Sequence, residues 1–470
     1  MTDLEGESED ERGAPAASAP ATGLAASEAA AKKKLISCSL FGIAMFLVPF
    51  PYDGSWTIAL GVLTQESRTW IGDDMRRLTT PIFVLGSLLA ALYNLTPSRF
   101  ARQLPGASIF LLSHWVWTTL ALLAGVLAMM TFLQIGPEWV IGKSTGTTAF
   151  VDVAGTIFLI IGLGCLLLPF LTDYGLLDFV GVILQRPFQK AFRLPGRATV
   201  DTLASWVGAS SLAVIMTGQQ YEKGFYTARE SAVIATNFSV VSIPFVFFVA
   251  QVAGIPEYFF QLYGAMIVVC LICAQLTPLL PPLRGVADEY FPSAGKKIQE
   301  DVPSSHSRLN WAWERALATS ASSPQLALSA RRALASAGTV FLTMMPISMT
   351  IEFLALVTYE YTPILQWVTW PLISVLELLQ IPEASAAAPG LIIGLFDQFV
   401  PAIIAGTLTE PLTQFVLAGL SVTQLIFFSE SAILITRSAI PLSVPQLVQI
   451  FAIRSVIALP LLAAIGHWVF

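Results

Sequence analysis

Polar side chains gather in two stretches of an otherwise apolar chain, and both stretches hold residues that can bind a solute or an ion. The first, "SWVGASSLAVIMTGQQYEKGFYTARESAVIATNFSVVS", runs from Ser205 to Ser242 and is rich in hydroxyl, amide and small side chains. The second, "LFDQFVPAIIAG", places Asp397 beside Gln398. Carboxylates and other polar groups at membrane depth are typical of solute and ion pathways, although small polar residues also let helices pack closely.

We expect these residues to line one polar cavity as a group, whereas helix packing is the simpler role for any single serine. A carboxylate at Asp397 can hold a cation or accept hydrogen bonds from a neutral polar solute. The candidate substrate-binding residues are Ser205, Ser210, Ser211, Thr217, Asn237, Ser239, Asp397, Gln398, Ser421, Thr423 and Gln424.

Further charges lie within apolar segments near the end of the chain. Glu430 and Arg454 lie deep in the last two predicted crossings, and Glu352 lies in an earlier one, where it could titrate. A charge at the bilayer centre costs at least about 2.5–3.5 kcal/mol, and an ion pair between Glu430 and Arg454 would offset this cost. We therefore expect these two residues to form a structural ion pair or to take part in coupling.

The elements that position these residues are predicted to be membrane helices. The chain has 470 residues, of which 55% are hydrophobic and 12% are charged, with a mean hydropathy of +0.71. This composition is typical of an all-α polytopic membrane protein. Because a helix needs about 20 residues to cross the hydrocarbon, we count about nine transmembrane helices, at 35–51, 80–96, 109–133, 149–170, 230–253, 258–280, 333–357, 412–436 and 444–468.

The distribution of basic residues predicts the orientation. When the N-terminus is placed in the cytoplasm, most of the 25 Lys and Arg residues fall in or beside cytoplasmic connections, as the positive-inside rule requires. The acidic, Ala-rich start of the chain is typical of a disordered tail. The triple lysine 32–34 before the first apolar run, with no cleavage site after it, indicates an anchor that is retained.

The order of segments repeats in the two halves of the chain. Each half has an interfacial helix, a short re-entrant segment broken by small or polar residues, and three full crossings, so the second repeat must have the inverted topology. Inverted repeats with broken segments are the architecture of many secondary transporters. The predicted division is a disordered acidic tail (1–31), N-terminal transmembrane helices (32–148), a first repeat (149–281), a cytoplasmic loop (282–332) and a second repeat (333–470).

Several function classes lack their motifs. Gly142-Lys143-Ser144 does not have the spacing of a phosphate-binding loop, the three histidines are scattered, and no nucleophile motif is present. We therefore expect no enzyme activity, no bound metal and no nucleic-acid partner. Cys270 and Cys273 are expected to be packing residues. The segment "RLNWAWERALA" is expected either to rest on the inner leaflet or to be a simple tether.

Two motifs also resemble a known family. The stretch "DTLASWVGASSLAVIMTGQQYEKGFYTARESAVIATNFSVVSI" and the later "FDQFVPAIIAG", "LSVTQLIFFSESAILI" and "FAIRSVIALP" are similar to YjiH-like bacterial membrane proteins with a nucleoside-recognition, or Gate, domain. The resemblance covers about 35–470. It implies a bacterial inner-membrane protein distantly related to concentrative nucleoside transporters and to the membrane part of ferrous-iron transport GTPases. Phe396 departs from the pattern, where a small residue such as Ala would be expected before Asp397, and this affects the cavity volume rather than the fold.

The preferred hypothesis is a secondary transporter of a nucleoside or similar small polar solute, with its site between the two re-entrant segments. Its partners would be the lipid bilayer and the solute, and Na⁺ or H⁺ would be the coupling ion, with no other cofactor. The alternative is a membrane protein that does not transport and instead senses a ligand or scaffolds partners. Metal-ion permeation is weaker, because the spans contain few soft ligands beyond Cys270 and Cys273.

Overall fold

The computed structural model describes residues 21–46, 48, 50–52, 55–95, 115–196, 198–207, 210–295 and 307–470. Most of these residues are helical, and one short pair of strands is present, in which β1 (Phe50–Tyr52) pairs antiparallel with β2 (Ser55–Thr57). Within the described ranges, six helical segments are long and apolar enough to cross a membrane: Ala59–Asn94, Trp115–Leu133, Glu138–Thr172, Pro256–Leu279, Leu326–Tyr361 and Val444–Val469. The chain is therefore a multi-pass membrane protein, as predicted.

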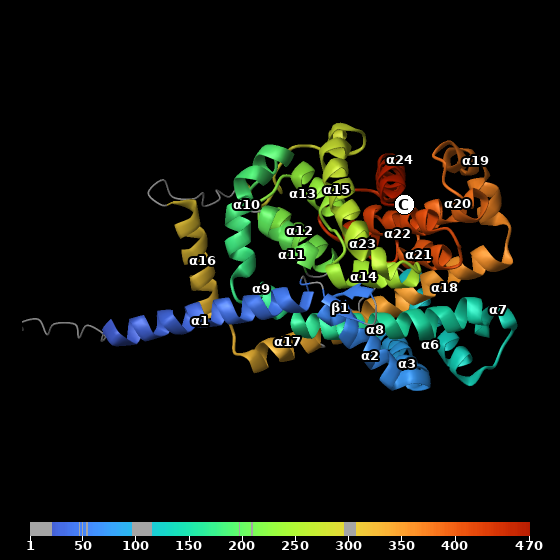
Figure 1. Cartoon of the computed structure of the whole chain (residues 1–470), viewed down its shortest axis with the longest axis horizontal. Coiled ribbons are helices and arrows are strands. Elements are labelled where there is room, and N and C mark those ends of the chain that lie inside the picture. Colours follow the sequence, from blue (N-terminus) through green and yellow to red (C-terminus); the bar gives the residue numbers. More distant parts are fainter. Residues whose placement is uncertain are drawn as a thin grey trace, which may run out of the picture.

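The helices of the first third pack mainly on one another and on the helix that opens the second half (Figure 1). The long helix α1 contacts α2 and α9 of this group and extends away from them towards α16 (Arg308–Ser322) (Figure 1). The elements are α1 (Ala21–Phe46), α2 (Ala59–Ile71), the 3₁₀ turn η1 (Gly72–Asp74), α3 (Met75–Leu95), α6 (Trp115–Leu133), α7 (Glu138–Ile141), the π-helix η2 (Lys143–Val153), α8 (Ala154–Leu167) and α9 (Pro169–Thr172).

The next part of the chain is the range in which an interfacial helix and a re-entrant segment were predicted. The amphipathic helix α10 precedes a helical hairpin, α11 and α12, which is followed by two short helices and one long one. Their bounds are α10 (Leu176–Phe192), α11 (Ala198–Val207), α12 (Ser210–Glu222), α13 (Ala228–Asn237), α14 (Ile243–Val252), η3 (Pro256–Tyr258), α15 (Phe259–Leu276), η4 (Thr277–Leu279) and η5 (Leu283–Gly285).

The second half repeats this order of elements. A bent helix formed by α17, η6 and α18 leads to α19, a hairpin of α20 and α21, two short helices and a final long one. The bounds are α16 (Arg308–Ser322), α17 (Leu326–Thr339), η6 (Val340–Met344), α18 (Met345–Tyr361), α19 (Ile364–Leu378), α20 (Ala384–Ile393), α21 (Phe399–Gly406), α22 (Pro411–Thr423), α23 (Ser431–Arg437) and α24 (Val444–Val469). The inverted orientation of the two units and the total of nine crossings remain predictions.

Two predicted crossings are not continuous helices. The range 230–253 is divided between α13 and α14, with residues 238–242 outside both helices. The range 412–436 is divided between α22 and α23, with residues 424–430 between them. We call these two interruptions the first break and the second break. The prediction of full helices was wrong here because the apolar pattern continues through each break, and hydropathy does not report whether backbone hydrogen bonds are made.

The N-terminal boundary also differs from the prediction. Helix α1 begins at Ala21, inside the range 1–31 that was expected to be disordered. The composition explains this, since the range 21–31 is rich in alanine, the residue with the highest helix propensity. Residues 1–20 lie outside the described part of the chain.

The Trp-bearing segment of the predicted cytoplasmic loop is a packed helix rather than a simple tether, and its position on the inner leaflet stays a prediction. It forms α16, which packs against α1 and α10. The hydroxyl of Ser320 donates to the carbonyl of Ala31 at 2.8 Å, and Lys34 Nζ donates to the carbonyls of Ser323 and Pro324, both at 3.2 Å. The Trp313 ring packs edge-on against Phe179 of α10. Hydrogen bonds therefore hold the C-terminal end of α16 and the residues after it against the middle of α1, and an aromatic pair holds α16 against α10.

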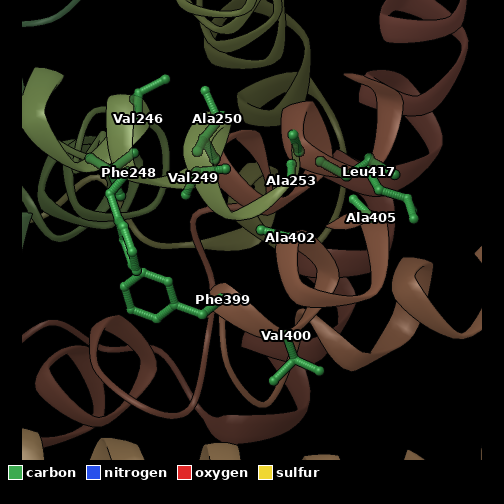
Figure 2. Close-up of a cluster of buried hydrophobic side chains, with 14 of the residues drawn as sticks. Val246, Phe248, Val249, Ala250, Ala253, Phe399, Val400, Ala402, Ala405 and Leu417 are labelled. Atoms are coloured by element: carbon green, nitrogen blue, oxygen red, sulfur yellow. The ribbon is translucent and has the colours of Figure 1, made fainter. Parts of the chain in front are cut away.

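The largest apolar core joins both halves of the chain. In Figure 2, Phe248 of α14 lies close to Phe399 of α21, and Ala253, which directly follows α14, lies close to Ala402 of α21. The Phe248 and Phe399 rings have centroids 5.1 Å apart. Small side chains let these two short helices approach closely, so the helix that follows the first break is packed directly on the second hairpin.

Glu383 caps the start of α22 from the turn before α20, outside the membrane-spanning segments. Its carboxylate accepts hydrogen bonds from the backbone N–H groups of Glu410 at 3.1 Å and Thr409 at 3.0 Å. The bond from Glu410 is the main cause that lowers the pKa of Glu383 below its ordinary value, and the bonds from Thr409 add to it. The ionised form is therefore favoured by folding.

Glu383→Gln is expected to lower the unfolding temperature slightly at neutral pH, because the stabilising carboxylate is lost. A group with a lowered pKa in the folded state stabilises above its unfolded pKa and loses this effect as pH falls. The difference between wild type and variant should therefore shrink on acidification below the ordinary range of Glu. Thermal unfolding across pH measures this, with Glu377→Gln on the exposed face of α19 as control. A difference that stays constant with pH would contradict it.

Candidate site at the two helix breaks

The two breaks bring helix ends into the interior of the protein. Helix α13 ends at Asn237 and α22 ends at Thr423, and both residues are fully buried. The last carbonyl groups of a helix have no partner within the helix, and they carry the negative end of the helix dipole. Buried helix ends of this kind require donors or a cation from elsewhere.

Arg454 of α24 supplies these donors to both helix ends. Its Nε and Nη2 atoms donate to the carbonyl of Thr423 at 3.1 and 2.6 Å. Its Nη1 atom donates to the carbonyl of Thr236 at 3.3 Å and to Asn237 Oδ1 at 2.6 Å. The Arg454 side chain is fully buried. One guanidinium therefore joins the end of α13 to the end of α22.

The predicted ion pair between Glu430 and Arg454 is not formed in this structure. The hydrogen-bond partners of Arg454 are backbone carbonyls, the Asn237 amide and, at 3.8 Å, the sulfur of Cys270. Glu430 instead lies in the second break, where it acts electrostatically on Asp397. The physical reason is that two helix dipoles ending at one point offset a buried guanidinium without a carboxylate.

Asn237 is held in place by several contacts. Its Oδ1 atom accepts from Arg454 and from the hydroxyl of Thr277 at 2.7 Å, and its Nδ2 atom donates to the carbonyl of Val233 at 3.2 Å. All the hydrogen-bonding capacity of Oδ1 is thus used by the protein. Asn237 belongs to the framework of the site rather than to the surface that a solute would contact.

The tip of the second hairpin docks on the second break. Between α20 and α21, the carbonyls of Leu395 and Phe396 accept hydrogen bonds from the N–H groups of Phe428 at 2.8 Å and Ser429 at 2.9 Å. The fully buried Asp397 lies in this tip and accepts from the N–H of Phe399 at 2.7 Å. The hydroxyl of Ser348 on α18 donates to the other carboxylate oxygen of Asp397 at 3.4 Å.

Gln398, Ser421 and Gln424 lie together beside this tip. The hydroxyl of Ser421 donates to the carbonyl of Gln398, and Gln424 Nε2 donates to the carbonyl of Leu391 and to Ser455 Oγ, both at 2.9 Å. The Oε1 atoms of Gln398 and Gln424 are buried without a hydrogen-bond partner among the described residues. Buried acceptors of this kind call for a donor, which a bound solute can provide.

The first hairpin is placed similarly against the first break. Ser205 Oγ on α11 donates to the carbonyl of Val240 at 3.2 Å. Within the described part, the buried hydroxyls of Ser239 and Thr217 have no partner. The side chains of Ser210 and Ser211 lie outside the described residues, although α12 begins at Ser210.

The structure therefore groups the predicted residues into three sets. Asp397, Gln398, Ser421 and Gln424 meet at the second break, Asn237 and Thr423 meet at Arg454, and Ser205 and Ser239 lie at the first break. Ser239 lies within the first break whereas Ser421 lies inside α22, so the two serines occupy different positions relative to their breaks. In the described structure, no hydrogen bond joins Thr217 to the other candidates.

Sequence reasoning missed several hydroxyl groups that contact the site, among them Ser455, Ser348 and Thr277. Ser348 is bonded to Asp397, and Thr277 is bonded to Asn237. Ser348 stands four residues before Glu352, and this spacing places both on one face of α18, which was the available signal. Thr277 follows an apolar helix in a position that no periodic pattern marks.

A close backbone approach fixes the position of the second hairpin. A Cβ atom added at Gly406, at the end of α21, would lie 2.2 Å from the carbonyl oxygen of Val252 on α14. This contact is with backbone, which cannot rotate away, so the two helices would have to separate.

Gly406→Ala is expected to destabilise the protein by roughly 1–3 kcal/mol, the usual cost of overpacking. Thermal unfolding of the purified protein measures the effect. Gly264→Ala on α15 is the matched control, because nothing lies within 4 Å of the added Cβ there. Equal unfolding temperatures for the two variants would show that the contact between α14 and α21 is not tight.

Comparison with known proteins identifies the family. Residues 154–256 match the Gate family, described as nucleoside recognition. The chain is 37% identical over 440 residues to the uncharacterized protein BpOF4_10220 of Alkalihalophilus pseudofirmus, covering 93% of this chain and 94% of that protein. The chain belongs to the family of BpOF4_10220. The match confirms the predicted resemblance of this BpOF4_10220-family protein to Gate proteins. The first hairpin and the first break both lie within the matched residues.

Solved structures are also similar to the BpOF4_10220-family protein. The structure of CNTnw in an inward-facing substrate-bound state is 14% identical, covers 93% of this chain and 98% of that chain, and has a TM-score of 0.41. A variant of CNTnw in an outward-facing state gives the same identity, the same coverage and the same TM-score.

Proposed function

We propose that the protein is a secondary transporter of a nucleoside or a similarly small polar solute, coupled to Na⁺ or H⁺, with the solute bound between the two hairpins and the two breaks. The observation that carries this proposal is the match of residues 154–256 to the Gate nucleoside-recognition family, which coincides with the first hairpin and the first break. Broken helices that meet inside a membrane protein are the usual setting of solute and ion sites in secondary transporters.

The polar atoms at the second break support the same proposal. The unpartnered Oε1 atoms of Gln398 and Gln424 are acceptors, and Asp397 in its ionised form offers further acceptor positions. A nucleoside carries hydroxyl and N–H donors that such acceptors can bind. The proposed cellular setting is a bacterial inner membrane with the N-terminus in the cytoplasm, supported by the bacterial relative and by the distribution of basic residues.

A thermal-stability screen in detergent tests binding first. A ligand that binds only the folded state raises stability by mass action, by about 2.7 kcal/mol at one hundred times its dissociation constant. We expect at least one of uridine, adenosine, cytidine and the free bases to raise the unfolding temperature. Sealed proteoliposomes with the radiolabelled hit then test flux, with protein-free liposomes as control. Binding without flux would favour the ligand-sensor alternative. The absence of both binding and flux would contradict the proposal.

A role in metal permeation has less support. Cys270 and Cys273 are both buried, and Cys270 lies against the guanidinium of Arg454, which repels a metal cation. Among the described residues, no group of three or more His, Cys, Asp or Glu side chains is arranged to hold a metal ion.

A further inference from the structure

Glu352 has a buried carboxyl group that no hydrogen bond stabilises among the described residues. It lies on α18, within the candidate membrane span Leu326–Tyr361, and its side chain is fully buried. Neither of its carboxylate oxygens has a hydrogen-bond partner in the described part of the chain. Burying an ionised carboxylate without a partner costs much more free energy than burying the neutral acid.

Glu352 lies near a second buried carboxyl group, that of Asp397. Ser348 stands one turn earlier on the same face of α18, and its hydroxyl donates to Asp397 Oδ2 at 3.4 Å. The charge of Asp397 acts directly on Glu352, and the charge of Glu430 acts in turn on Asp397. The protein therefore buries two carboxyl groups close enough to interact electrostatically, and a third interacts with Asp397.

The helices packed against α18 bring no cation to this pair. Helices α6 and α21 and the π-helix η6 contribute no titratable side chain. The titratable groups on the other neighbours are Arg76, Arg77 and Tyr93 of α3, Lys143 and Asp152 of η2, and Glu377 of α19. Among the charged groups, only Asp397 acts on Glu352. Two interacting carboxylates without a cation cannot both be ionised at low cost.

The helix ends that commonly hold a coupling Na⁺ are already neutralised here. In many secondary transporters the C-terminal ends of broken helices and the unwound carbonyls beside them coordinate Na⁺. In this protein the corresponding carbonyls of Thr236 and Thr423, with Asn237 Oδ1, are bonded to the guanidinium of Arg454. The fixed charge of the side chain takes up the position that a mobile cation would need.

We propose that Glu352 and Asp397 form a proton-binding site that supplies the coupling ion, and that Arg454 excludes Na⁺ from the two helix ends. The proposal rests on the proposed transport function and specifies its ion. One proton is held by the carboxyl pair, and it leaves when the pair becomes accessible to water on the other side of the membrane.

Infrared spectroscopy of the purified full-length protein tests the proton site without any transport. The C=O stretch of a protonated carboxyl group, shifted in D₂O, should be present in wild type at neutral pH and lost in Glu352→Gln. Glu360→Gln, on the same helix but exposed, should leave the band unchanged. Absence of the band from wild type, or its full persistence in Glu352→Gln, would overturn the proposal. If the variant does not fold, disappearance of the wild-type band as the pH is raised serves as the second measurement.

Exclusion of Na⁺ is tested separately. The unfolding temperature of wild type should be the same in sodium chloride and in choline chloride at equal ionic strength, and a Na⁺-specific increase would overturn this part. In proteoliposomes, uptake of uridine should follow an inward proton gradient and be the same with either salt. Absence of uptake under every gradient would refute the proposed transport of this solute, whereas the infrared result still decides the proton site.

Discussion

Arg454→Met is expected to be the most destabilising single substitution in the protein. The change leaves the carbonyls of Thr236 and Thr423 and the Oδ1 atom of Asn237 without their guanidinium partner. Each buried polar group left unsatisfied costs about 1–3 kcal/mol. The two carbonyls lose their donor, whereas Asn237 Oδ1 keeps its bond from Thr277, so the loss is roughly 2–6 kcal/mol. Size-exclusion chromatography and thermal unfolding in detergent should show a large fall in folded protein.

Two further variants separate charge from geometry at this position. Arg454→Lys keeps the positive charge but loses the planar fork that reaches both helix ends, so we expect intermediate stability. Arg332→Met, on the exposed face of α17, is the matched control and should unfold like wild type. If Arg454→Met is as stable as the Arg332 variant, the guanidinium does not hold α13 and α22 together.

Asp397→Asn is expected to leave the protein folded while reducing ligand binding and uptake by at least about tenfold. Asparagine keeps an Oδ1 atom that can accept from the N–H of Phe399, so the tip of the second hairpin retains its shape. The ionic charge is lost, however, and a hydrogen bond to a charged group contributes about 1.5–3 kcal/mol, where 1.4 kcal/mol corresponds to tenfold in affinity. Ligand-dependent thermal shifts and proteoliposome uptake measure the two effects.

The matched comparison for this residue is Asp397→Ala. Alanine removes the acceptor for the Phe399 N–H as well as the charge, and the loss of such a cap costs about 0.5–2 kcal/mol. The alanine variant should therefore be less stable than the asparagine variant, although both should fail to bind. Wild-type affinity and flux in Asp397→Asn would show that this carboxyl group does not contact the solute.

Much of the fold follows from features that a sequence displays directly. Re-entrant segments were predicted because small and polar residues interrupt apolar runs near Ser210 and Asp397, and helical hairpins lie at both places. The predicted Gate resemblance rested on the same stretches and is confirmed by the family match. These signals are local, so they do not depend on how distant helices pack.

The breaks and the partner of Arg454 could not be predicted in the same way. Apolar residues run on through Val240 and Ile426, so nothing in the hydropathy marks the missing helical hydrogen bonds. Arg454 was paired with Glu430 because both are charged residues in neighbouring crossings, whereas its actual partners are backbone carbonyls at helix ends. Every residue carries the same backbone carbonyl, so the sequence does not indicate which carbonyls will bind a charged side chain.

The hydrogen bonds between the second hairpin and the second break also allow opening of the hairpin to be followed at the backbone amides. The amides of Phe428 and Ser429 are protected only while Leu395 and Phe396 remain docked. Any motion that withdraws the hairpin from the break must release both amides at once. Hydrogen–deuterium exchange at these two positions therefore follows opening of the hairpin, without a label and without knowledge of the transported solute.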